Sequence, residues 1–430
     1  MKDNRHHINL ISLIVRVLDK FYIYGLYGLV LYPAIPAVAQ MDSCLFMRNH
    51  RISPDEQGEL RIEIDNVSFF KDNEWQKVTN GYTLPGLWIQ PKATYNPLKN
   101  LHLEAGLHSL IYAGCTKYPN IIYQDMAVWK GDQYMSGTHI LPYFRANLQL
   151  GNINVILGDI YGGANHHLPE PLFSQELNLS ADPEMGMQTI VDINRLHLDL
   201  WANWQSFIFL NDHHQESFIF GLNTAYTPYA STSSDISNKL SIPLSFIAHH
   251  RGGEKIDSIY HKSVKTVLNG SIGLAWQSDI RDSWLKRWQI ETHLLGYYQE
   301  AGTLYPKDKG WGIYSKIAMQ TCCGIGAKIG YEHSHNFISL LSYPFYGTLS
   351  TRDNTGTYDN TDMLNIQIDW TKRFGKHYTF GIRGEAFTFF PHGGYSDGTI
   401  YIPEKISQNL SIGIFLKVNP SFVIGKLKED

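Results

Sequence analysis

A two-residue alternation of apolar and polar side chains recurs along this chain and restricts its fold more than any other feature. The clearest example is LHLEAGLHSL at residues 101–110, where Leu and Ala alternate with His and Glu. Successive side chains of a β-strand point to opposite faces, so this stretch predicts a strand with one apolar and one polar face. The apolar face could pack in a soluble core, or it could face lipid around a polar interior.

The same alternation returns to the end of the chain, in segments 60–70, 86–95, 141–150, 153–162, 196–208, 364–374 and 378–390. Short connections at 96–100, 151–152, 194–195, 323–326 and 375–377 alternate with long polar ones at 71–83, 114–137, 163–183, 301–310, 340–361 and 391–408. Two connections fit less well, because 209–215 is short for a long-loop end and 228–238 is long for a turn. The layout predicts about 16 antiparallel strands.

Other β architectures and mixed folds fit this pattern poorly. No segment with a helical period follows residue 40, which excludes α/β folds because they need crossover helices. A β-propeller would show a blade repeat of about 40 residues, and we find none. A series of β-sandwiches would show linkers between domains, and these are missing too. A single closed barrel therefore remains.

Composition favours a barrel in a membrane. Charged residues make up 18% of the chain and aromatic residues 13%, against about 25% charged in ordinary globular proteins. The mean hydropathy of −0.23 leaves no room for a bundle of transmembrane helices, and a net charge of −4 argues against a nucleic-acid partner. Many aromatic residues fall near expected strand ends, as girdles at the two lipid–water boundaries require. They are Tyr95, Tyr143, Phe144, Trp201, Trp204, Trp276, Trp288, Tyr297, Tyr298, Trp311, Tyr314, Tyr331, Trp370, Phe374, Phe389 and Phe390.

The N-terminal region has the composition of a secretory signal. Basic residues precede an apolar stretch that ends on Ala37-Val38-Ala39, a site with small residues suited to cleavage. We expect residues 1–39 to be a signal peptide, 40–59 to be a periplasmic lead or a plug, and 60–430 to be the transmembrane barrel. A membrane anchor is the alternative for the first segment.

The cysteines do not form a disulfide scaffold or a zinc site. Cys44, Cys115, Cys322 and Cys323 are few for a chain of 430 residues, and none has the C-x-x-C spacing of a zinc ligand pair. We expect the adjacent pair Cys322-Cys323 to lie at a strand end without a redox role. Paired histidines in 163–171, 211–217 and 248–254 are expected by chance among 19 histidines. We therefore predict no metal and no cofactor.

Together these patterns resemble Gram-negative outer-membrane β-barrels of the porin or transport-channel type. Segments rich in aromatic residues, Asn and Trp, such as DLWANWQSFIF, are similar to those of barrels from the Bacteroidota. The resemblance covers nearly all of the chain after the signal, at the level of architecture. It implies a transmembrane antiparallel β-barrel of about 16 strands in the outer membrane, with short periplasmic turns and longer extracellular loops. One departure is the end of the chain, where Phe422 lies inside the last apolar run and a charged tail follows.

The polar faces, projected inward, give the candidate site residues. We expect them to line the lumen and to set its selectivity, especially where loop 114–137 or loop 163–183 folds inward. Pairing of these charges across strands in a solvated wall is the other interpretation. The candidates are Lys92, His102, Glu104, His108, Arg145, His197, Asp199, Glu291, His293, Asp369, Arg383 and Glu385.

Three functions follow for such a barrel. The first is a porin-like channel for passive diffusion of small polar solutes, with the lipid bilayer as its other partner. The second is a plugged barrel that serves as a platform for surface or periplasmic proteins, or that forms a homo-oligomer. The third is an outer-membrane hydrolase. Catalytic motifs are missing, and His and acid residues two apart on a strand are separated by about 7 Å, so we predict no enzyme.

Overall fold

The computed structural model describes residues 41–75, 81–113, 138–206, 216–252, 265–300, 308–339, 341, 360–391 and 406–426. The expected signal peptide and loop 114–137 lie outside these ranges. Four short helices are described, α2 (Met41–Leu45), η1 (Pro54–Glu56), η4 (Gly163–His166) and α4 (Leu177–Ser180). The strands are β1 (Glu59–Glu74), β2 (Tyr82–Leu98), β3 (Leu101–Tyr112), β4 (Thr138–Leu150), β5 (Ile153–Asp159), β6 (Met185–Ile193), β7 (Leu196–Ser206), β8 (Ser217–Thr232), β9 (Ile236–Arg251), β10 (Lys265–Ile280), β11 (Leu285–Gln299), β12 (Lys309–Thr321), β13 (Ile325–His335), β14 (Asn360–Phe374), β15 (Tyr378–Pro391), β16 (Ser407–Val418) and β17 (Ser421–Lys426).

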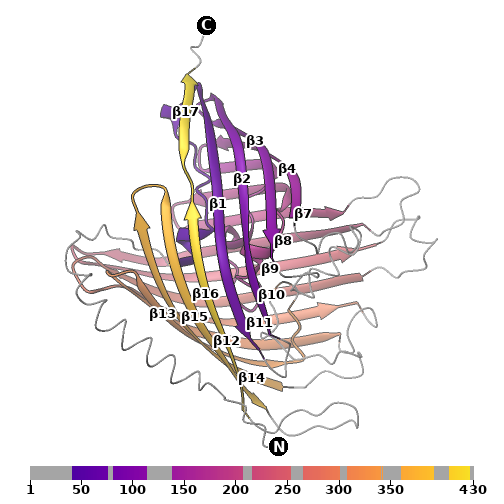
Figure 1. The fold of residues 1–430 in the computed structure, drawn as a ribbon. Helices are drawn as coiled ribbons and strands as arrows, with labels where there is room; N and C mark the ends of the chain where they lie inside the picture. Colours follow the sequence, from indigo (N-terminus) through magenta and orange to yellow (C-terminus); the bar gives the residue numbers. More distant parts are fainter. Residues whose placement is uncertain are drawn as a thin grey trace, which may run out of the picture. The chain divides into compact units, whose positions relative to one another are not determined.

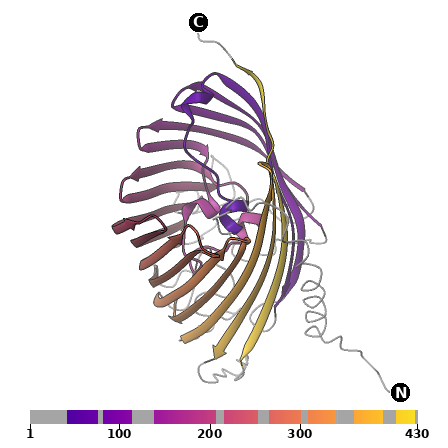
Figure 2. The same ribbon diagram turned by 90° about the vertical axis from the view of Figure 1, so that its left-hand side faces the viewer.

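The strands form one antiparallel sheet that closes on itself as a barrel (Figures 1 and 2). Each strand from β1 to β15 pairs with the next along the chain, and β1 also pairs with the end of the chain, with β17 along its first half and with β16 along its second half. Because β16 and β17 are successive parts of one interrupted last strand, the barrel wall has 16 strand positions. The predicted fold and the predicted number of strands are confirmed.

Short turns and long connections alternate as the sequence indicates. Residues 99–100, 151–152, 194–195 and 375–377 separate hairpin partners at one end of the barrel. The doubtful connection at 228–238 belongs to this end as well, because β8 continues to Thr232 and β9 begins at Ile236. Only three residues form the turn, and the polar Ser and Thr residues around it belong to the strands. The other doubtful stretch, 209–215, lies outside the described residues.

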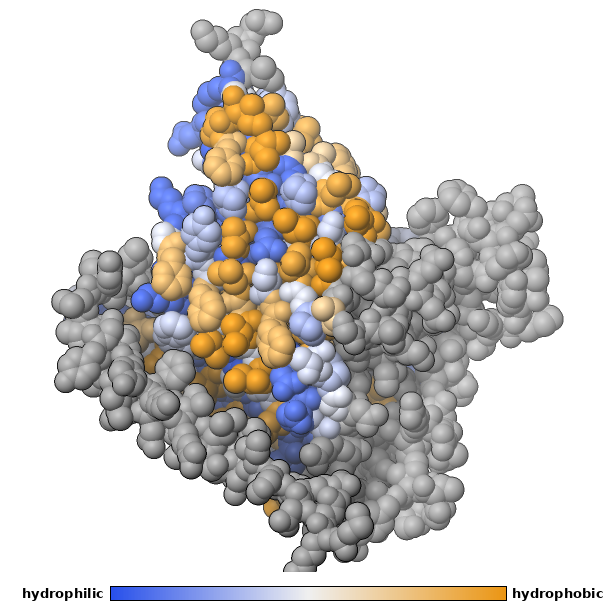
Figure 3. Space-filling model, in the orientation of Figure 1, coloured by the Kyte–Doolittle hydropathy of each residue, from blue (hydrophilic) through white to orange (hydrophobic). Residues whose placement is uncertain are grey.

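The two faces of the barrel differ as the alternation predicts. On β3, Leu107 is 48% exposed on the outside, whereas Glu104 and His108 are buried inside. Apolar side chains cover much of the outer surface of the described strands in Figure 3. A closed barrel with this apolar exterior is the β-structure that can span a bilayer, because its backbone groups are paired around the whole ring. The chain is an outer-membrane β-barrel.

No helix among the described residues is long and apolar enough to cross a membrane.

The outward orientation that a girdle requires is found for some of these aromatic residues and not for others. Phe144, Trp204, Tyr298 and Trp311 are exposed on the outer surface by 44–54%. Five others point inward and are almost completely buried, so the girdle assignment was wrong for them. They are Tyr143, Trp201, Tyr297, Tyr314 and Phe389. Neighbouring residues of a strand face opposite sides, so nearness to a strand end does not decide which side an aromatic residue faces.

The face assignment predicts different effects for two arginine substitutions on β7. Leu198 lies on the outer face with Leu196 and Leu200, whereas Asn203 shares the inner face with Asp199 and Trp201. We expect Leu200→Arg, near the middle of β7, to destabilise the inserted barrel by about 2–4 kcal/mol, the figure for arginine facing lipid near the midplane. Asn203→Arg should be tolerated. Urea unfolding from lipid vesicles measures both variants, and equal stability would show that the faces are assigned incorrectly.

Candidate functional site

Two segments of the chain occupy the barrel interior. Residues 41–58, here called the inner segment, enter at the short-turn end, where the Gly58 amide donates to the carbonyl of Asn96 at 2.8 Å. Its helix α2 contacts β14, β15 and β16 and is visible inside the ring of strands in Figure 2. Residues 160–184, here called the inward loop, connect β5 to β6 and carry η4 and α4. The lead and loop 163–183 named from the sequence therefore both lie in the lumen.

The inward loop leaves the wall where strand structure ends. Gly158 has φ +92°, and a Cβ there would lie 2.2 Å from the carbonyl oxygen of Phe144. Pro169 and Pro171 follow in the loop and lack the amide hydrogen that a strand needs. The chain therefore cannot continue as an ordinary hairpin and turns inward.

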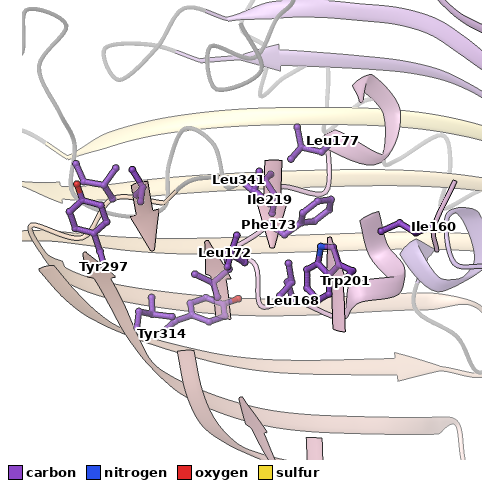
Figure 4. Close-up of a cluster of buried hydrophobic side chains, with 14 of the residues drawn as sticks. Ile160, Leu168, Leu172, Phe173, Leu177, Trp201, Ile219, Tyr297, Tyr314 and Leu341 are labelled. Carbon is purple, nitrogen blue, oxygen red and sulfur yellow. The ribbon is translucent and has the colours of Figure 1, made fainter. Parts of the chain in front are cut away.

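Apolar side chains hold the inward loop against the wall. Leu168, Leu172, Phe173 and Leu177 from the loop are buried with inward-facing residues of the wall strands (Figure 4). The wall contributes Ile190, Trp201, Ile219, Ile247, Val267, Leu295, Tyr297 and Tyr314 to this cluster. Burying a large apolar side chain contributes about 1.5–3 kcal/mol, so the loop is docked firmly in the lumen.

His166 joins the inward loop to the wall by charge. Its Nδ1 lies 2.7 Å from Asp199 Oδ2, its Nε2 lies 3.2 Å from Glu184 Oε2, and its ring stacks on Trp201 with centroids 3.6 Å apart. Burial lowers the pKa of His166, but the two carboxylates outweigh it and raise this pKa to about 9. His166 is therefore an imidazolium at neutral pH, held between two acids.

The inward loop and the inner segment also bind each other. The backbone amide of Arg48 donates to Asn165 Oδ1 at 3.1 Å, and Asn165 Nδ2 donates to the carbonyl of Arg48 at 2.7 Å. The Arg48 side chain donates to Tyr143 and to Gln90. The two hydrogen bonds between Arg48 and Asn165 join the inner segment and the inward loop into one internal unit.

The first ionic cluster lies on β1 to β4 beside Arg48. Glu104 accepts from Lys92 at 2.6 Å and from Arg145 at 2.9 Å, and Lys92 lies 3.2 Å from Asp65. Arg145 also donates to the carbonyl oxygens of Asp159, the last residue of β5, and Ile160, the first residue of the inward loop. The cluster therefore anchors the start of the loop rather than standing free in solvent.

The second ionic cluster includes Lys71 of β1 and continues across the β1–β16 seam to β12–β15. Arg383 pairs with Asp369 at 2.8 Å and with Asp42 of the inner segment at 2.9 Å. Lys71 pairs with Glu176 of the inward loop at 2.8 Å. Lys328 pairs with Glu170 of the same loop at 2.8 Å, and Tyr314 donates to Glu170. Each inner element thus brings a carboxylate to a basic residue of the wall.

Glu170 and His166 respond to pH in opposite directions. Burial raises the pKa of Glu170, but Lys328, Lys316 and the Tyr314 hydroxyl lower it further, to about 2. The carboxylate of Glu170 therefore stabilises the docked loop above the ordinary Glu pKa, and this contribution is lost as the pH falls through about 2. The imidazolium of His166 stabilises it below the ordinary His pKa, and this is lost as the pH rises through about 9.

We therefore expect the docked loop to be most stable between about pH 4.5 and 6.5. In this range Glu170 and His166 are charged in both the docked and the released loop, so docking requires no change of protonation. Each contribution is on the order of 3 kcal/mol at most. The temperature at which the folded barrel loses its compact mobility on electrophoresis should be highest in this range and should fall toward both extremes. In a Glu170→Gln variant this temperature should no longer fall at low pH, but it should still fall at high pH. A flat profile from pH 3 to 10 would contradict these assignments.

Two cavities lie in series beside the second ionic cluster. One, of about 30 Å³, is lined by Met41, Gln320, Gly324 and Thr371 and lies near the short turn at 322–324. The other, of about 50 Å³, is lined by Trp75, Gln175 and Phe387, toward the long-loop end. Glu170, Lys328 and Gln367 line both. The Glu170–Lys328 ion pair therefore lies between two adjoining spaces on one side of the lumen.

A third cavity, of about 110 Å³, lies beside the first ionic cluster. Its lining includes Arg48, Trp88, Tyr143, Arg145 and Glu184. The Arg145 guanidinium stacks on Tyr161, 4.0 Å from the ring centroid, and is fully engaged by its acceptors. Arg48 and Asn165, which join the inner segment to the inward loop, also line this space.

A serine and a histidine meet at the long-loop end of β8 and β9. Ser217 Oγ lies 3.1 Å from His249 Nε2 and 2.9 Å from Gln205 Oε1, to which it donates. Both side chains are buried. While Ser217 donates to Gln205, His249 must donate to Ser217 and cannot accept its proton. The pair becomes a nucleophile and base only if the Gln205 amide turns and donates to Ser217.

The candidates from the sequence all face the interior, and the structure divides them into groups. Lys92, His102, Glu104, His108 and Arg145 gather at the first ionic cluster, and Asp369, Arg383 and Glu385 at the second. Asp199 binds His166, and His197 binds Asp192, which also holds His50 of the inner segment. Glu291 and His293 lie near Lys316. Their role in selectivity stays a prediction.

Sequence reasoning missed the partners that lie on the inner segment and the inward loop. These are Asp42, Arg48, His166, Glu170, Glu176 and Glu184. The apolar residues of 168–177, unusual in an exposed loop, were the available signal. Within the described part of the chain, no three His, Cys, Asp or Glu residues are grouped to hold a metal ion. His249 and His250 lie next to each other on β9 and therefore face opposite sides.

A family model described as lipid A 3'-O-deacylase-type matches residues 52–427. The chain belongs to the lipid A 3'-O-deacylase-type family. The match begins in the inner segment and ends just after β17, so it covers the inward loop, the first ionic cluster and all of the second except Asp42 in this deacylase-type barrel. A search of curated proteins finds no relative of the chain.

Solved outer-membrane barrels are similar to this deacylase-type chain in general form. OccAB1 from Acinetobacter baumannii has 9% identity and a TM-score of 0.47, with 86% of this chain and 100% of that chain covered. OpdK from Pseudomonas aeruginosa has 7% identity and a TM-score of 0.44, with 85% and 100% covered. OprD from the same organism has 6% identity and a TM-score of 0.40, with 88% and 99% covered. With TM-scores below 0.5, these likenesses support no conclusion about function.

Proposed function

We propose that this barrel is a narrow channel for small polar solutes, and that the Glu170–Lys328 ion pair is its constriction. The observation that carries the proposal is the pair of adjoining cavities, which share the polar residues Glu170, Lys328 and Gln367. They extend from the short-turn end toward the long-loop end along β12 to β15. A 16-strand wall is wide enough for an aqueous channel, and here the two inner elements narrow it.

The charges beside the two cavities favour solutes that are small and polar. Lys328 and Arg383 contribute positive charge, and Glu170, Asp369 and Asp42 contribute negative charge. Opposite charges across a narrow space create a field that orients dipolar solutes and repels none by net sign. Transport in this proposal is passive and involves no catalysis.

The proposal is tested by single-channel recording in planar bilayers. We expect small, steady, ohmic steps from the refolded full-length barrel. A correctly folded barrel that conducts no current would contradict the channel. It would support a plugged platform, in which the ion pairs and the inner segment serve only to fill the lumen.

Replacing Arg383 should change which ions pass. Arg383 lines the cavity of about 50 Å³, and Arg383→Gln leaves Asp369 and Asp42 without their basic partner. We expect the reversal potential in a salt gradient to shift toward cation selectivity. Arg145→Gln is the matched control, since Arg145 lines the separate cavity beside the first ionic cluster and should shift the potential less. Equal shifts for the two variants would place the conducting space elsewhere.

Deacylation of lipid A is a second candidate function, and two observations favour it. The family description names that reaction, and Ser217 lies next to His249 at the end of the barrel that faces outward in outer-membrane barrels. After the Gln205 amide has turned, His249 could take the Ser217 proton, and Ser217 Oγ would attack the ester and release the lipid A hydroxyl, which takes up that proton. Water would then hydrolyse the acyl-serine, release the fatty acid and restore the Ser217 hydroxyl. Mass spectrometry of lipid A from cells that produce the protein tests this function. Loss of an acyl chain that Ser217→Ala abolishes and Ser245→Ala leaves intact would support it, and unchanged lipid A would contradict it.

A further inference from the structure

The last strand of the barrel leaves its neighbour before it ends. Up to Asn419 it is held on both sides, and the Asn419 amide donates to the carbonyl of His377 at 2.9 Å. Pro420 follows, and β17 then pairs with the first half of β1 alone, from Glu59 to Glu63. Among the described residues, no strand pairs with the other edge of β17. Figure 1 shows β17 at the end of the barrel, beside β1.

This free edge carries apolar side chains on both faces. Phe422 is 59% exposed, Val423 is 55% exposed and Ile424 is 60% exposed. Phe422 lies opposite Ile62, on the outer side, whereas Val423 lies opposite Arg61, on the inner side. In Figure 3 an apolar patch covers this end of the molecule.

Such a strand is unfavourable in lipid and in water. In lipid, the unpaired backbone amides and carbonyls of the edge would each cost several kcal/mol. In water, the apolar side chains on both faces would stay exposed, and an open apolar edge is a template for another strand. A strand added to the edge removes both penalties at once.

We propose that the free edge of β17 is a docking site for an extended segment of a periplasmic protein, which adds to the barrel sheet beside Ser421–Lys426. The short-turn end faces the periplasm in outer-membrane barrels. The segment has alternating apolar side chains that cover Phe422 and Val423, and a carboxylate that meets Lys426, which now lies 3.6 Å from Glu59. Recognition is by backbone pairing, as in other cases of strand addition.

A second copy of this chain does not fit the same edge. Two copies in one bilayer have the same orientation, and their strands tilt by about 35–45° from the membrane normal. Where two such walls face each other the strands cross at a steep angle, so the two β17 edges cannot form a ladder. The proposal is also independent of whether the lumen conducts.

The test uses the refolded full-length barrel in lipid nanodiscs and a labelled peptide with the sequence of residues 59–66, ELRIEIDN. In the barrel, residues 59–63 of this sequence already pair with the edge of β17 that faces β1, so their side chains suit the strand. We expect saturable binding by fluorescence anisotropy. A peptide of the same composition without the alternation should bind about tenfold more weakly or worse, a difference of about 1.4 kcal/mol.

Two variants of the barrel test the site. Val423→Lys/Ile424→Lys places charges on the edge, and we expect binding of the acidic peptide to fall about tenfold even though the added charges attract it. Ser283→Lys/Trp284→Lys adds the same charges at an exposed short turn and should bind normally. Val423→Pro serves if the lysine variant does not fold. The proposal would be overturned if the two lysine variants bind the peptide equally, or if the irregular peptide binds as tightly as ELRIEIDN. It would also be overturned if the native barrel binds neither peptide. A dimer in detergent that depends on residues 421–426 would overturn it in favour of a second copy.

Discussion

The double variant Glu170→Ala/Lys328→Ala should conduct several-fold to about tenfold more current than the native barrel. Removing both partners leaves no unpaired buried charge and joins the cavities of about 30 and 50 Å³ into one space. A barrier lower by about 1.4 kcal/mol corresponds to a tenfold faster passage. Single-channel recording at constant salt measures the change.

A second ion pair provides the matched control for this result. Asp279 and Arg287 pair on β10 and β11, outside the lining of both cavities. The variant Asp279→Ala/Arg287→Ala should therefore leave the conductance unchanged. If the two double variants conduct equally, the Glu170–Lys328 pair is not the constriction, and the permeation path lies on another side of the lumen.

His166→Leu should destabilise the folded barrel by about 3–5 kcal/mol, the cost of removing one partner from a buried ionic network. The substitution leaves the carboxylates of Asp199 and Glu184 without their imidazolium and removes the stack on Trp201. Urea unfolding in lipid measures the loss. The loop should also become susceptible to added protease, because its main polar anchor is gone.

The neighbouring histidine gives the comparison. His167 is exposed, contacts His197 edge-on and has φ +52°, a left-handed conformation that Asn adopts readily, so His167→Asn should change stability by less than about 0.5 kcal/mol. A similar loss in both variants would mean that apolar packing of Leu168, Leu172 and Phe173 holds the inward loop and that the charge of His166 contributes little.

The fold could be predicted because one physical rule repeats along the chain. The alternation at 101–110 already separates Leu107, which faces lipid, from Glu104 and His108, which face the interior. The same rule corrects the aromatic girdle, since Trp201 shares the inner face with Asp199 whatever its distance from the strand end. Strand count, turn ends and inner faces all follow from local patterns.

The interior could be predicted only in part, because it depends on contacts between distant segments. Asp199 was recognised as an inner residue, but its partner His166 lies on a loop whose direction no local pattern encodes. Arg383 was recognised too, but it binds Asp42, 341 positions away in sequence. The sequence pattern predicts which residues face inward, and the folded inner elements decide which of them meet.

The inner segment has a mechanical consequence for the barrel wall. The wall closes where β1 meets β16, a seam between the two ends of the chain. On one side of this seam the inner segment is bound to Arg383 through Asp42, and on the other side to Tyr143 and Gln90 through Arg48. It therefore fastens the seam from within, and the two ends of the sheet cannot separate sideways into the bilayer unless the segment is first withdrawn.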